Sequence, residues 1–103
     1  MTIPVTPDNI DPIIHERVRL SIVAALAMVQ EMSFNDLKDT LSLTDGNLSA
    51  HARKLEDSGY IEVTKSFRSR RPHTTMHLTN KGRLAYQKYL AMLKNIVEQG
   101  EQS

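Results

Sequence analysis

Apolar residues recur at helical spacing in the first third of the chain and predict a long first helix. Asp11 is a favoured N-cap residue and Pro12 is favoured at the first helical position, so we expect the helix to begin there. One apolar stripe then passes through residues 14, 18, 22, 25, 26 and 29, and a second through residues 13, 20, 23 and 27. Because a helix that is apolar on two faces has to bury both, one face is expected to pack on a partner.

Two shorter helices joined by a tight turn come next. Ser33 is placed to cap a helix over residues 34–41, and Thr44 is placed to cap another that reaches about Ser58. Gly59 is the C-cap signal of that second helix. Because a turn of about three residues separates the two helices, the pattern is typical of a helix-turn-helix motif.

The period then changes to that of β-strands. Apolar and β-branched residues alternate over residues 60–67 and again over 74–78, which predicts two strands joined by a turn at 68–72. Thr79 is placed to cap a last helix that reaches about Gln99 and carries two apolar stripes of its own. The sequence therefore predicts a mainly α fold with one small β-hairpin (α+β), in the order α-α-α-β-β-α.

Length and composition narrow the class of protein. The 103 residues allow one domain, and the absence of cysteine excludes disulfides, thiolate zinc sites and cysteine nucleophiles. The longest apolar run, residues 22–29, is far shorter than the ~20 residues of a membrane span, and the N-terminus has no basic region before an apolar run. We therefore expect a soluble cytoplasmic protein that does not contact a membrane.

The formal net charge of +1 conceals a separation of charge along the chain. Residues 1–50 carry three basic and seven acidic side chains (net −4), whereas residues 51–94 carry ten basic and three acidic ones (net +7). The last nine residues add two glutamates. Such asymmetry indicates a polyanionic partner, although a solvated charged surface accounts for it equally well at this point.

The helix at 44–58 has one apolar side and one side suited to DNA. Leu48, Ala52 and Leu55 fall together and are expected to face the core. The opposite side is small, polar or basic, which suits the major groove because small residues allow close approach while Asn and Arg hydrogen-bond base edges. Asp45 has an alternative role in neutralising the helix dipole, and His51 has one in packing. The candidate DNA contacts here are Thr44, Asp45, Gly46, Asn47, Ser49, Ala50, His51, Arg53 and Lys54.

The turn between the two predicted strands is the second candidate DNA contact. It carries three arginines in four positions, and arginines on a protruding hairpin match a phosphate backbone or a narrow minor groove. A charged edge that discourages strand aggregation is the alternative, but lysine would serve that purpose equally well. The candidate residues are Lys65, Arg68, Ser69, Arg70 and Arg71.

Several segments together resemble a known family. They are Thr-Asp-Gly-Asn-Leu-Ser at 44–49, His-Ala-Arg-Lys-Leu-Glu at 51–56, Gly-Tyr-Ile at 59–61 and Leu-Thr-Asn-Lys-Gly-Arg at 78–83. Over residues 12–93 the chain resembles a MarR/ArsR-like winged helix-turn-helix transcriptional regulator. The resemblance implies sequence-specific binding of double-stranded DNA by a homodimer. Helix 44–58 would lie in the major groove, and the wing at 67–74 on the flanking backbone or minor groove.

The two prolines and the lack of a hydrophobic period near the N-terminus, together with the resemblance, predict a division of the chain. Residues 1–11 would be an N-terminal arm, residues 12–99 a winged helix DNA-binding domain with terminal dimerisation helices, and residues 100–103 a tail. The two double-striped helices are what such a dimer requires. The candidate interface residues are Ile13, Leu20, Tyr86, Tyr89, Leu90, Leu93, Ile96 and Val97.

The sequence gives no support for catalysis or for a cofactor. No Ser/His/Asp spacing, glycine-rich phosphate loop or carboxylate pair indicates an enzyme, and no convergent set of histidines indicates a metal site. No small-molecule effector is identified by the residues. Two alternatives stay open, namely a winged-helix protein–protein interaction module without specific DNA binding and a metal-responsive switch.

Overall fold

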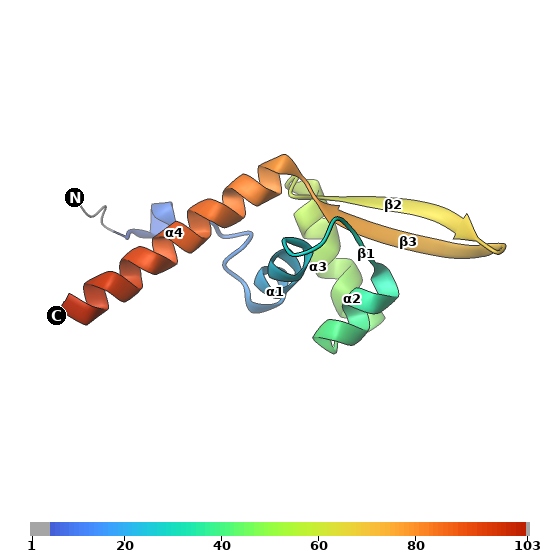
Figure 1. The fold of residues 1–103 in the computed structure, drawn as a ribbon, viewed down its shortest axis with the longest axis horizontal. Helices are drawn as coiled ribbons and strands as arrows, with labels where there is room; N and C mark the ends of the chain where they lie inside the picture. Colours follow the sequence, from blue (N-terminus) through green and yellow to red (C-terminus); the bar gives the residue numbers. More distant parts are fainter. Residues whose placement is uncertain (1–4, 103) are drawn as a thin grey trace.

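The computed structural model describes residues 5–102, so residues 1–4 of the predicted arm and Ser103 of the predicted tail lie outside the described part. A short 3-10 turn, η1 (Pro7–Asn9), precedes the helices. The remaining elements are α1 (Arg17–Leu26), β1 (Met32–Ser33), α2 (Phe34–Leu41), α3 (Asp45–Asp57), β2 (Ile61–Arg68), β3 (Arg71–Leu78) and α4 (Asn80–Gln102). The molecule measures 58 × 24 × 21 Å because the β2–β3 hairpin and α4 extend in opposite directions from the central helices (Figure 1).

Side-chain caps fix the starts of three helices where the sequence predicted them. The hydroxyl of Ser33 accepts a hydrogen bond from the N–H of Asp36, and the hydroxyl of Thr44 accepts one from Asn47, both at 3.1 Å. Thr79 Oγ1 likewise accepts from Gly82 N–H at 3.0 Å at the start of α4. These bonds satisfy N–H groups that have no partner within the helix, so the three predicted starts are confirmed.

The predicted start of the first helix at Pro12 is wrong, because α1 spans Arg17–Leu26, and the apolar stripe continues to residue 29 beyond the end of the helix. Asp11 does cap a single turn, in which its Oδ1 accepts from the N–H of Ile13 at 2.8 Å. Glu16 then adopts an extended conformation, and its carboxylate accepts hydrogen bonds from the first N–H groups of α1. This second cap restarts the helix and turns Ile14 away from the axis of α1 toward α4.

The sheet has the antiparallel order β1-β3-β2. The two-residue strand β1 was not predicted, since it is defined only by its pairing, with Met32 opposite Met76. The hairpin turn is tighter than the predicted 68–72, because Arg68 pairs with Arg71 and only two residues lie between them. These two residues, Ser69 and Arg70, have φ angles of 49° and 67°, the left-handed pair that a type I′ hairpin turn requires.

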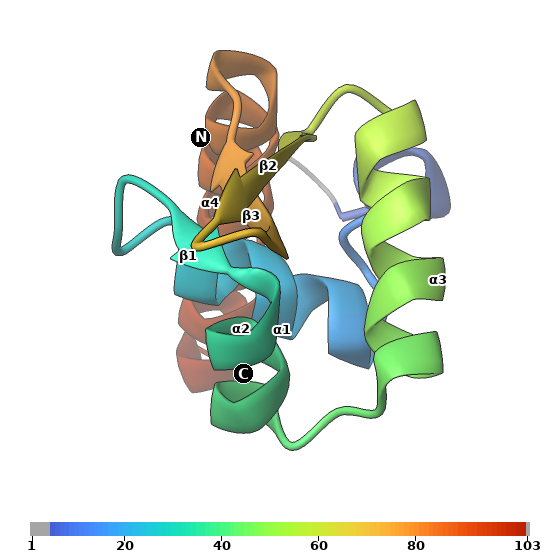
Figure 2. The ribbon, with the colours of Figure 1, turned by 90° about the vertical axis from the view of Figure 1, so that its right-hand side faces the viewer.

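Two apolar clusters hold the chain together. The main core joins α1, α2, α3 and the base of the sheet around Ile22, Leu37, Leu48 and Ile61, which are at most 1% exposed. A smaller cluster of Ile14, Tyr89 and Met92 joins the N-terminal segment to α4. Figure 2, viewed along the hairpin, shows α3 as a separate column at one side of the helical body. Within residues 5–102, no helix has the length and apolar character to cross a bilayer.

Candidate nucleic-acid interface

Helix α3 has a buried face and a polar face, as its sequence predicted. Leu48, Ala52 and Leu55 are at most 5% exposed and belong to the main core. The other face is open to solvent. Its exposed residues include eight of the nine candidate DNA contacts, Thr44, Asp45, Gly46, Asn47, Ser49, Ala50, Arg53 and Lys54.

Asp45 is held by a cation of the preceding helix. Its Oδ1 lies 2.9 Å from Nζ of Lys38 on α2. The hydrogen bond from Lys38 to this carboxylate, together with its charge, raises the pKa of Lys38 above its ordinary value. Lys38 therefore partly neutralises the charge of Asp45. Asp45 lies at the N-terminal end of α3, where the helix dipole favours a carboxylate.

His51, the ninth candidate, differs from the others because it turns toward α1. Its side chain is 22% exposed, and its Nδ1 lies 3.5 Å from Glu16 Oε1 and 3.2 Å from Arg19 Nη1. Depending on the tautomer, His51 donates to the carboxylate or accepts from the guanidinium. Its place between α1 and α3 agrees with packing, the alternative role considered for it, and it does not lie on the polar face.

Glu16 links this cluster to the start of α1. Burial alone would raise the pKa of Glu16, but hydrogen bonds from the backbone N–H groups of Arg19 and Val18 and the charges of His51 and Arg19 lower it below its ordinary value. The carboxylate is therefore held in its charged form. Glu16 is a structural residue that joins α1 to the inner edge of α3.

The hairpin carries a dense positive charge beside α3. All five candidates, Lys65, Arg68, Ser69, Arg70 and Arg71, are exposed. The last carboxylate before the hairpin, Glu62, lies 2.9 Å from His77 across the strands, and the sequence has no further acidic residue until Glu98. A hairpin with this charge attracts a polyanion at long range and contacts it at short range.

A groove connects the polar face of α3 to the hairpin. Its polar lining consists of Ser49, Arg53 and Glu56 from α3 and of Lys65 and Thr74 from the strands. Thr74 was not among the predicted contacts, although it lies directly opposite Lys65 in the strand register. The interface is therefore one concave surface, in which a helix and a basic ribbon face the same space.

Arg68 lies on the other face of the hairpin. It lines a separate hollow with Asp36 and Asp39 of α2 and with His73. Side chains alternate along a strand, so Arg68 and Lys65 point to opposite faces. Lys65 thus lies along the groove, whereas Arg68 lies beside the acidic helix α2.

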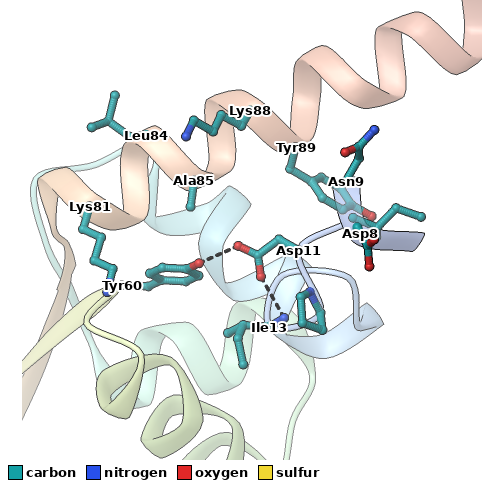
Figure 3. A pocket seen from close by; sticks show the side chains of 12 residues that line it. Asp8, Asn9, Asp11, Ile13, Tyr60, Lys81, Leu84, Ala85, Lys88 and Tyr89 are labelled. Carbon is teal, nitrogen blue, oxygen red and sulfur yellow. Dashed lines mark hydrogen bonds between the residues drawn. The ribbon is translucent and has the colours of Figure 1, made fainter. Parts of the chain in front are cut away.

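A pocket lies between the N-terminal segment and α4, and contacts around it join the two (Figure 3). The hydroxyl of Tyr60 donates to Asp11 Oδ2 at 2.5 Å, while Nδ1 of His15 lies 2.8 Å from the hydroxyl of Tyr89. Burial and the hydrogen bond to Asp11 raise the pKa of Tyr60 to about 12. Lys81 Nζ lies 5.8 Å from the centre of the Tyr60 ring.

Comparison with known proteins agrees with this geometry. The family model described as winged helix DNA-binding domain matches residues 18–97. The chain belongs to this winged helix DNA-binding domain family. The uncharacterized protein MJ0432 of Methanocaldococcus jannaschii is 45% identical to this winged helix protein over 83 residues, which are 77% of this chain and 90% of the relative.

Solved structures extend the comparison. A transcriptional regulator homologue from Pyrococcus horikoshii is 31% identical and matches 84% of this chain and 86% of its own, with a TM-score of 0.80. The M. tuberculosis regulator MosR, solved with DNA, shares the fold at 18% identity and a TM-score of 0.68, over 89% of this chain and 65% of its own. An ArsR family regulator, RHA00566, shares the fold at 20% identity and a TM-score of 0.63, over 88% and 94%. The predicted resemblance to a winged helix transcriptional regulator is confirmed, and the chain shares its fold with an ArsR family regulator.

The candidate dimer residues of this winged helix protein fall into three groups. Leu90, Ile96 and Val97 on α4 are 43%, 43% and 58% exposed. Half-buried positions packed within the chain are occupied by Ile13, Leu20, Tyr86 and Leu93. Tyr89 is 5% exposed and packs against the N-terminal segment of its own chain.

Proposed function

We propose that this winged helix protein is a sequence-specific regulator of transcription that binds double-stranded DNA. The observation that carries the proposal is the concave surface formed by the polar face of α3 and the basic hairpin, joined by the groove at Arg53 and Lys65. In this proposal α3 enters the major groove, and the hairpin follows the flanking backbone or minor groove. Its role is binding rather than catalysis, in the cytoplasm where its DNA lies.

In this proposal α3 contributes mainly sequence specificity, and the hairpin contributes mainly affinity. Asn47 is exposed near the start of α3, where an amide can pair with an adenine edge. Arg70 and Arg71 lie at the hairpin tip, where guanidinium groups meet phosphates. Affinity contributed by the tip is expected to be independent of sequence, whereas Asn47 is expected to select among sequences.

Two variants test this division. Asn47→Ala is expected to lose about 1–3 kcal/mol of discrimination at one base-pair position while retaining non-specific binding. Arg70→Ala with Arg71→Ala is expected to weaken binding to every duplex by a similar factor. Binding measured on a pool of randomised duplexes separates the two effects. Wild-type affinity in the double arginine variant would overturn the role of the hairpin.

We also propose that the protein acts as a homodimer through α4. Tyr86, Leu90, Leu93 and Val97 follow one another at spacings of four, three and four residues, which is the seam of a coiled coil. On a second stripe of α4, Ala85, Tyr89 and Met92 pack in the cluster around Ile14 of the same chain, whereas Ile96 is 43% exposed. The first seam is the more exposed one, and a second copy of α4 would cover it. Two copies would present two hairpins and two α3 helices to a pseudo-palindromic site.

Light scattering tests the dimer. The wild-type protein at micromolar concentration is expected to have twice the mass of the chain, and Leu90→Glu with Val97→Glu is expected to halve it without unfolding α1–α3. A monomeric wild-type protein would overturn the dimer. If the wild-type protein were monomeric and also bound no duplex at low salt, the exposed face of α4 would favour the alternative function, a protein–protein interaction module.

A further inference from the structure

Phe67 is an aromatic residue exposed near the tip of the hairpin. Its side chain is 76% exposed, although the phenyl ring is the kind of surface that folding normally buries. From Thr64 to Thr75, only Phe67 and Pro72 are apolar, and none of these residues is acidic. Packing within the chain therefore does not account for this ring, and the arginines around it indicate a polyanionic partner.

The strand register shows which way this ring faces. Side chains of Ile61, Val63, Lys65 and Phe67 share one face of the hairpin, because successive residues of a strand alternate. Ile61 is buried in the main core, and Val63 and Lys65 line the groove beside α3. Phe67 is the outermost member of this series and lies opposite Pro72. The face that packs on the core at its base therefore ends in an apolar pair at its tip.

We propose that Phe67 is an apolar wedge that enters the DNA minor groove next to the major-groove site of α3. This inference rests on the proposed function. The ring packs against deoxyribose or between two base pairs, while Arg70 and Arg71 neutralise the phosphates on either side. Apolar side chains on minor-groove elements act in this way, and they widen or kink the duplex as they enter.

The geometry favours DNA over a membrane surface. An exposed aromatic residue among arginines also suits an anionic lipid headgroup layer. However, the face that carries Phe67 continues into the concave groove beside α3, lined by Ser49 and Arg53. A concave surface fits the convex backbone of a duplex, whereas a lipid layer is flat on this scale.

The test compares Phe67→Ala with Met28→Ala, a matched control that removes an apolar side chain 86% exposed in the turn after α1. The probe is a duplex of about 30 base pairs enriched from a random pool by the wild-type protein, long enough for two half-sites one turn apart. Phe67→Ala is expected to bind about tenfold more weakly, with an unchanged dependence on salt because the substitution removes no charge. Phe67→Leu is expected to recover most of the affinity, and Met28→Ala to match the wild type.

Thermal unfolding of Phe67→Ala is expected to match the wild type, because an exposed ring contributes little to the fold. If Phe67→Ala binds the duplex as tightly as the wild type, the wedge is wrong while the proposed function stands. If the wild-type protein binds no duplex even at low salt, the proposed function fails. If phosphatidylserine vesicles retain the wild type but not Phe67→Ala, and duplex binding is equal, the ring is a lipid contact instead.

Discussion

The helical body and the two arms that extend from it differ in how far their apolar side chains are exposed. In the body, formed by α1, α2, α3 and the base of the sheet, Ile22, Leu37 and Leu48 have no exposed surface. In the arms, formed by the outer hairpin and α4, Phe67 is 76% and Val97 is 58% exposed. Hydrophobic burial accounts for most apolar residues of the body, whereas the outer hairpin and one side of α4 carry apolar residues that the chain itself does not cover. The proposed functions accordingly lie mostly in the arms and on the solvent side of α3.

The largest effect is expected from removing a side chain of the body. Leu48→Ala leaves a cavity beneath α3 and is expected to lower the free energy of unfolding by about 2–5 kcal/mol. Phe67→Ala removes a larger side chain from an arm and is expected to change it by less than about 0.5 kcal/mol. Urea denaturation measures both. Similar losses in the two variants would contradict the comparison.

The next effect concerns the joint between the body and α4. A Cβ on Gly82 would lie 2.1 Å from the carbonyl oxygen of Tyr60. Gly82→Ala is therefore expected to cost about 1–3 kcal/mol of stability, since the backbone has to move. Gly46 in α3 is the control, because a Cβ there meets nothing within 4 Å. Gly46→Ala is expected to be neutral or to stabilise by up to about 1 kcal/mol, and a loss as large as that of Gly82→Ala would refute the steric explanation.

A smaller effect is expected at the start of α1. Glu16→Ala removes the carboxylate that caps α1 and is expected to cost about 1 kcal/mol at neutral pH. Because the fold lowers the pKa of Glu16, this contribution is present above the ordinary glutamate pKa and is lost as the pH falls through the lowered value. The free energies of unfolding of the wild type and Glu16→Ala, measured at several pH values, should therefore converge in acid. Glu31→Ala, which removes an exposed carboxylate outside the helices, should show no such difference.

The smallest expected effect is a change in the ultraviolet titration of one tyrosine. Three tyrosines are present, and the one at position 60 has a pKa of about 12. Its contribution to stability is present below the ordinary tyrosine pKa and is lost as the pH rises through about 12. Ultraviolet absorbance should reveal this late titration, which Tyr60→Phe abolishes and Asp11→Asn moves to lower pH. A late step that persists in Tyr60→Phe would assign it to another tyrosine.

Local signals made much of the fold predictable. Ser33, Thr44, Gly59 and Thr79 mark helix ends through bonds or dihedral angles formed within a few residues, and the structure has each where it was expected. The predicted start of the first helix was wrong because a second local cap follows the first one. Asp11 caps one turn as predicted, but the carboxylate of Glu16 provides a second cap that periodicity does not reveal.

Features that depend on contacts between distant residues could not be predicted from local sequence signals. Strand β1 is two residues long and depends on Met76, which is 44 positions away from its partner Met32. A helical wheel places His51 beside the buried face of its helix and Tyr89 within an apolar stripe, but it does not identify the residue that each side chain contacts. In the structure the neighbours are Glu16 for His51 and Ile14 for Tyr89, both supplied by the segment that the prediction placed in one continuous helix.

The most direct test of the central claim, that α3 and the hairpin form one DNA-binding surface, is a salt titration of duplex binding by fluorescence anisotropy. For the wild type, the logarithm of the binding constant is expected to fall linearly with the logarithm of salt concentration. Arg70→Ala with Arg71→Ala should make the slope shallower by about one unit for each phosphate that the variant no longer neutralises. No binding by the wild type at low salt, or an equal slope in the arginine variant, would contradict the claim.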